Sequence, residues 1–99
     1  MAGGAAVPKF KQIRERGIRF VFKYDVDAPD LLHIYARHLT TIDDALDVFF
    51  DPSATQTYNA EHQRYERYGR SHGLFWFWLE RDAVVMVITC FSEEAHGQA

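Results

Sequence analysis

Two groups of basic and aromatic residues are the side chains best suited to chemistry. Arg37 and His38 are adjacent, and a second segment contains Arg64, Tyr65, Arg67, Tyr68, Arg70 and His72. Histidine transfers protons near neutral pH, and the arginine guanidinium matches phosphate oxygens. Since RNA supplies its own 2′-hydroxyl nucleophile, a protein that cleaves it need only move protons and stabilise charge on the phosphate. Aromatic side chains beside such cations would stack on unpaired bases.

Each of these residues also has an ordinary structural interpretation. His38 continues the apolar stripe of an expected helix and fits a hydrogen-bonded core histidine. The arginines of segment 64–70 can pair with Glu61, Glu66 or the aspartates. The run Phe75-Trp76-Phe77-Trp78 fits a core or an interface as well as a platform for bases. The residue types alone leave both interpretations open.

Other catalytic devices are not indicated. His33 and His38 are five residues apart, about 140° around a helix, which is awkward for a shared metal ion. The other histidines lack ligand-like spacing, and the sequence contains no nucleophile elbow and no glycine-rich phosphate loop. The one cysteine, Cys90, lies in an apolar run and is expected to be a small buried hydrophobe. We therefore expect no metal and no cofactor.

Composition and charge fit one folded domain. The chain has 99 residues, of which 47% are hydrophobic and 25% charged, with a formal net charge of −3. That total argues against a protein that mainly coats nucleic acid. It hides a segregation, because segment 1–24 holds six cations and one carboxylate whereas segment 25–51 holds seven aspartates and one arginine. The two blocks either neutralise each other in the fold or leave a local site for an anion.

Hydrophobic periodicity predicts the elements that must position these side chains. The alternation of Ile18, Phe20, Phe22 and Tyr24 indicates a strand with one buried face. Lys9 to Arg16 is interpreted as a short basic turn or helix. A first amphipathic helix is expected from the stripe Leu31, Ile34, Tyr35 and His38, with Asp27 or Asp30 as its cap. A second helix is expected from a capping box at Thr41-Ile42-Asp43-Asp44 to Asp51-Pro52.

The second half of the chain predicts a sheet. A polar stretch, 53–63, precedes three strand-like segments at 64–70, 74–79 and 83–91, of which the last two are apolar on both faces. The fold class is therefore α+β: an N-terminal strand, two short helices, then a three- to four-stranded antiparallel sheet. We expect residues 1–16 to be a flexible basic segment, 17–92 a single α+β domain and 93–99 a flexible tail.

The sequence predicts a cytoplasmic protein. The N-terminal residues lack the apolar core of a signal peptide. Glu80-Arg81-Asp82 interrupts the longest apolar stretch, 74–91, so this stretch is not expected to span a membrane.

A series of short motifs resembles a known family. In order these motifs are Phe22-Lys23-Tyr24-Asp25, Arg37-His38, Val48-Phe49 with Asp51-Pro52, Arg64-Tyr65-Glu66 with Gly69-x-Ser71, and Val87-Ile88-Thr89. Their order resembles the BrnT-type toxins of bacterial toxin–antitoxin pairs, and more loosely the small RelE-like ribonucleases. The resemblance implies a ribosome-independent ribonuclease toxin that a DNA-binding antitoxin neutralises. It also implies that Arg64 and the Arg37-His38 pair lie near the active face.

Three hypotheses follow. The first is a metal-independent endoribonuclease with His38, Arg37 and Arg64 as catalytic residues, RNA as substrate and an antitoxin as partner. Its substrate-binding residues would be Tyr65, Tyr68, Arg70 and His72. The second is a non-catalytic interaction module on the same fold, which forms a homodimer or docks a partner through its aromatic strand. The third, an enzyme for a small molecule in an aromatic pocket, has no cofactor signature behind it.

Overall fold

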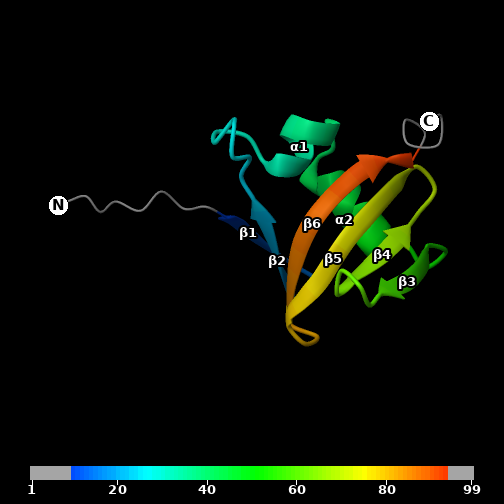
Figure 1. Cartoon of the computed structure of the whole chain (residues 1–99). Helices are drawn as coiled ribbons and strands as arrows, with labels where there is room; N and C mark the ends of the chain where they lie inside the picture. The colour runs from blue at the N-terminus through cyan, green and yellow to red at the C-terminus, as the bar shows by residue number, and fades with distance from the viewer. Residues whose placement is uncertain (1–9, 94–99) are drawn as a thin grey trace.

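Two helices and a six-stranded sheet make up the computed structural model, which describes residues 10–93 (Figure 1). The elements are β1 (Phe10–Glu15), β2 (Ile18–Lys23), α1 (His33–His38), α2 (Ile42–Phe50), β3 (Thr55–Asn59), β4 (Arg64–Tyr68), β5 (His72–Glu80) and β6 (Val84–Ser92). The strand order is β1-β2-β6-β5-β4-β3. All neighbours are antiparallel except β2 and β6, which run parallel.

The α+β class is confirmed, but the sheet is larger than predicted and mixed rather than antiparallel. The two long apolar strands, β5 and β6, occupy its centre, as expected for strands with two covered or half-covered faces. The sequence missed β1 and β3, which are the two edges of the sheet. Edge strands have little apolar surface to bury, so their sequences carry a weak alternation.

The assignment of segment 1–16 is corrected where the structure describes it. Residues 10–15 form a strand within the sheet rather than a turn, a helix or a separate segment. Ile13 is the only residue of β1 that is partly buried. The sequence feature that indicates a hairpin here is Arg16-Gly17. These two residues have φ angles of 52° and 81° and form the two-residue turn between β1 and β2. Residues 1–9 and 94–99, including most of the expected tail, lie outside the described residues.

The second helix is confirmed and the first is shorter than predicted. Thr41 Oγ1 accepts the backbone N–H of Asp44, and the Asp44 carboxylate accepts that of Thr41, so the capping box at the start of α2 is complete. Helix α1 has six residues, and its N-cap is Leu32, without a side-chain cap. Neither Asp27 nor Asp30 therefore caps it. The predicted stripe is wrong in part, because Ile34 is buried whereas Tyr35 and His38 are exposed.

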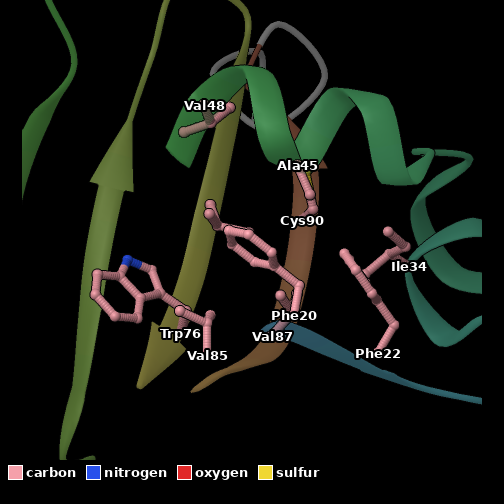
Figure 2. Packing of buried hydrophobic residues seen from close by; sticks show 10 residues of the cluster. Phe20, Phe22, Ile34, Ala45, Val48, Trp76, Val85, Val87 and Cys90 are labelled. Carbon is pink, nitrogen blue, oxygen red and sulfur yellow. The ribbon is translucent and has the colours of Figure 1, made fainter. Parts of the chain in front are cut away.

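Both helices pack on one face of the sheet and enclose the core. Figure 2 shows Ala45 and Val48 of α2 and Ile34 of α1 above the side chains of the strands. The strand residues of this core cluster are Phe20, Phe22, Leu74, Trp76, Val85, Val87 and Cys90. The Phe49 ring makes edge contacts with Phe20 and Trp76 at centroid distances of 4.9 and 5.0 Å. Within residues 10–93, no helix is long and apolar enough to cross a bilayer.

We predict that Cys90 does not react with a thiol reagent while the protein is folded. Its side chain has no exposed surface, and burial raises the pKa of the thiol to about 12. Ellman's reagent at pH 8 should release one equivalent of colour in denaturant and almost none in native buffer. Rapid labelling of the native protein would contradict the packing of β6 against the helices.

Candidate functional site

The sheet face that the helices leave uncovered carries most of the candidate residues. Because side chains alternate along a strand, the residues between the core positions point to this side. We call it the open face, and define it by Arg14, Arg19, Val21, Lys23, Arg64, Glu66, Tyr68, Phe75, Phe77, Met86, Thr89 and Phe91. Its centre is apolar, and cations from β1, β2 and β4 lie to either side.

A β-bulge turns the end of β6 toward the open face. Phe75 pairs with Thr89 whereas the next residue, Trp76, pairs with Val87, so Ile88 is the extra residue. Simple alternation would have put Thr89 and Phe91 on the side of Val87, under the helices. The bulge reverses them, so that Cys90 enters the core and Phe91, whose exposed fraction is only 8%, lies on the other side of the sheet opposite Gly73.

Beside α1 this face has a hollow of about 540 Å³. Its lining residues are Arg37, His38, Leu39, Phe75, Thr89, Phe91 and Ser92. The Phe91 ring occupies the space above Gly73, where a Cβ would lie 2.5 Å from Phe91 Cζ. Since the ring would clash with a side chain there, glycine is required at position 73.

Phe75 and Phe91 bring the residues from three elements together. The two rings are 5.1 Å apart, and the His38 imidazole lies 6.1 Å from Phe91. The Tyr68 ring lies 6.3 Å from both. On the other side, Arg64 Cζ is 4.2 Å above the Phe75 ring, a cation–π contact. His38, Tyr68 and Arg64 therefore surround one aromatic floor.

Polar residues beside the Phe75 and Phe91 rings determine the protonation and hydrogen bonding of the groups around them. Glu66 accepts hydrogen bonds from Asn59 and from Arg64 Nε, and these bonds lower the pKa of its carboxyl group. Burial, together with the charges of Glu66 and Glu93, raises the pKa of Tyr68, so its phenol stays protonated at neutral pH. Among the described residues, Thr89 Oγ1 is buried and has no hydrogen-bond partner.

Arg37 is held by two carboxylates. Its Nε donates to Asp25 Oδ1 at 2.8 Å, and its Nη2 donates to Asp27 Oδ2 at 2.7 Å. Asp25 is buried and also accepts the backbone N–H groups of Asp27 and Ala28. The hydrogen bond from Arg37 is the main cause that lowers the Asp25 pKa. Most of the charge of Arg37 is thus compensated within the protein.

The three remaining candidates lie on the helix side of the sheet. The Tyr65 ring stacks on Trp76 at 4.7 Å, within the aromatic layer next to α2. Arg70 and His72 line a separate hollow with Asp44, Asp47 and Asp51. His72 Nε2 lies 3.8 Å from Asp44 Oδ2 and its Nδ1 lies 3.0 Å from Ser71 Oγ. These carboxylates disfavour a phosphate there, so the structure separates these residues from His38 and Arg64.

Four residues of the site were not among the candidates. Phe91 and Thr89 depend on the bulge, which the sequence does not signal. Asp25 and Glu66 belong to the short motifs and could have been chosen as the carboxylates nearest to the arginines. Arg67 has a structural role, because it donates to the carbonyls of Val48 and Asp51 at the end of α2.

Comparisons with protein-family models, with curated proteins and with solved structures return no match. Within residues 10–93, no three His, Cys, Asp or Glu side chains gather in a way that could hold a metal ion. The functional interpretation therefore depends on the geometry of the open face.

We predict that Asp25→Asn destabilises the protein in a pH-dependent way. A carboxyl with a lowered pKa stabilises the fold above its ordinary value of 3.8, and this contribution disappears as the pH falls through the lower folded value. The variant should therefore melt several degrees below the wild type at pH 7, and the difference should close below about pH 3.8. Asp27→Asn is the control, because the Asp27 side chain is 79% exposed and a smaller loss is expected. Equal losses in the two variants would contradict the role of Asp25.

Proposed function

We propose that the open face binds single-stranded RNA and cleaves it without a metal ion. The observation that supports this most strongly is the grouping of His38, Tyr68 and Arg64 around the Phe75 and Phe91 rings. A partly exposed ring such as Phe75, with the buried Phe91 ring beside it, can stack on an unpaired base, and cations nearby attract the phosphates. The acidic side chains of α2 lie on the opposite side of the sheet, where they do not repel this substrate.

The proposed reaction is transfer of the phosphate to the neighbouring 2′-oxygen. The His38 imidazole takes the proton of the 2′-hydroxyl as that oxygen bonds to phosphorus. The bond from phosphorus to the 5′-oxygen breaks, and the imidazolium returns a proton to this leaving oxygen. The products are a 2′,3′-cyclic phosphate and a 5′-hydroxyl end, and no external reactant is consumed.

Arg64 and Arg37 have different roles in this proposal. Among the described residues, Nε is the one nitrogen of Arg64 with a hydrogen bond, so its Nη groups are available to the phosphate. Arg37 has both Nε and Nη2 engaged by aspartates, so we assign it a positioning role for α1 and His38.

Expression of the wild-type chain should arrest bacterial growth, and His38→Ala with Arg64→Ala should relieve the arrest. The same changes should lower cleavage of total RNA by the purified protein by about 100-fold each, since each removes a group acting on the transition state. Cleavage should be equal with and without a chelator. The products should carry cyclic phosphate ends, detectable by mass spectrometry.

Matched controls exist on the other side of the sheet. His72→Ala and Arg70→Ala remove the same residue types from the hollow beside α2 and should leave cleavage near the wild-type rate. If His72→Ala lost as much activity as His38→Ala, the site would be misassigned. If the wild type at high expression left growth and RNA intact, the ribonuclease proposal would be wrong.

We also propose the partner and location that the family resemblance implies. A BrnT-like ribonuclease needs a neutralising antitoxin, so we expect a small DNA-binding protein encoded beside it. Since its RNA substrate is in the cytoplasm, we expect the protein there too. Co-expression of that neighbour should restore growth to cells that make the active chain.

A second candidate function is an interaction module without catalysis. The observation in its favour is the uncovered apolar centre of the open face, where Phe75, Phe77 and Met86 are half-buried. Under this alternative, Phe77→Lys would abolish partner binding, and His38→Ala would have no effect on any function. The ribonuclease proposal predicts instead that His38→Ala strongly lowers RNA cleavage.

A further inference from the structure

The free edge of β1 is a hydrogen-bonding surface with a particular pattern of charge. β1 pairs with β2 on one side, and within residues 10–93 no strand pairs with its other side (Figure 1). In a two-residue hairpin the residues that flank the turn, here Glu15 and Ile18, exchange both backbone hydrogen bonds, and the pattern then alternates. Phe10, Gln12 and Arg14 consequently turn their peptide groups to the free edge.

An antiparallel copy of β1 could pair with this edge in four central registers. In a dimer with a two-fold axis perpendicular to the sheet, two paired residues must point to the same side of the sheet. One residue of β1 therefore lies on the axis and pairs with the same residue of the second copy. An axis at Lys11 or at Arg14 puts two like charges directly opposite each other, which is unfavourable. An axis at Gln12 sets Lys11 opposite Ile13 and forms no charged pair among residues 10–15.

The axis at Ile13 is the complementary register. It sets Ile13 against its own copy and Lys11 against Glu15 of the second chain, and the symmetry makes this pair twice. On the open face it sets Gln12 against Arg14. Its backbone pattern also fits, because Gln12 and Arg14 are the residues whose peptide groups point outward.

Helix α2 strengthens the same register. Glu15 lines a hollow of about 320 Å³ with Asp43 and Asp47 of α2. The cationic side chain that lines this hollow is Arg16, whose Cζ lies 4.5 Å above the Phe50 ring. A lysine placed opposite Glu15 therefore enters a region with three carboxylates and one guanidinium. The charge of this hollow is complementary to Lys11 of a second copy.

We propose that the chain forms a two-fold dimer through β1, with the axis at Ile13 and with Lys11 of each copy paired to Glu15 of the other. The dimer continues the sheet across the two subunits and keeps both open faces on the same side. Its interface is the basic edge strand and not the aromatic strand β5. It does not depend on the proposed ribonuclease activity.

Charge exchange in the full-length chain tests this proposal. Lys11→Glu and Glu15→Lys alone each place like charges opposite each other, and each should raise the dimer dissociation constant about tenfold, since two pairs change per dimer. The double variant K11E/E15K restores both pairs and should dimerise like the wild type. An equimolar mixture of the two single variants should also dimerise, because every Glu then faces a Lys.

Sedimentation equilibrium gives the dissociation constants, and circular dichroism shows that each variant is folded. Gln12→Pro is an independent variant, because it removes an outward N–H without disturbing the β1–β2 hydrogen bonds, and it should yield monomers. Gln12→Ala keeps that N–H and should dimerise.

Three results would overturn the proposal. They are a wild-type chain that stays monomeric at its highest soluble concentration, a dimer that persists in both single variants and in Gln12→Pro, and a mixture of single variants that stays monomeric. RNA cleavage by monomeric Gln12→Pro would show separately whether the proposed activity stands.

Discussion

The buried carboxylate of Asp25 is the constraint on which the site depends. Helix α1 has only six residues and no side-chain cap, so it is too short to be stable by itself. Asp25 connects it to the end of β2 through Arg37, twelve residues later, and through the backbone of the intervening loop. A buried charge is tolerated when its oxygens are fully hydrogen-bonded, and here the partners are two N–H groups and a guanidinium. His38 follows Arg37, and its place beside Phe91 is set by this carboxylate together with the buried Thr40 hydroxyl, which lies within hydrogen-bond distance of the carbonyls of Ile34 and Cys90.

The sequence predicted the parts of the fold that bury much apolar surface. β2 and α2 were expected because their core residues follow a regular period and because Thr41 and Asp44 form a capping box, and β5 and β6 were expected because both faces are apolar. The edges β1 and β3 were missed, since solvent replaces packing on much of their surface. The start of helix α1 was misjudged because its N-cap is Leu32, which has no capping side chain.

The candidate site was predicted only in part for a similar reason. Residue types selected His38, Tyr68 and Arg64, which the fold brings together, but also Arg70 and His72, which it places beside acidic α2. The side of the sheet to which a residue points depends on strand parity and, at the end of β6, on the bulge at Ile88, and neither follows from composition. The net charge of −3 likewise averages over two sides of a sheet that carry different charges. Cations gather on the open face, whereas most carboxylates of segment 43–51 lie with the helices.

The parallel pairing of β2 with β6 also determines the order in which the fold can assemble during synthesis. Val84, the partner of Arg19, is made 65 residues after it, and every other element except β1 is made between them. The β1–β2 hairpin therefore leaves the ribosome early, with the inner edge of β2 unpaired until the last strand emerges. In the β3–β4–β5 meander, the edge of β5 that pairs with β6 likewise stays unpaired until β6 is made. A nascent chain that stalls before β6 consists of two separate pieces of sheet, each with one hydrophobic edge open to other chains.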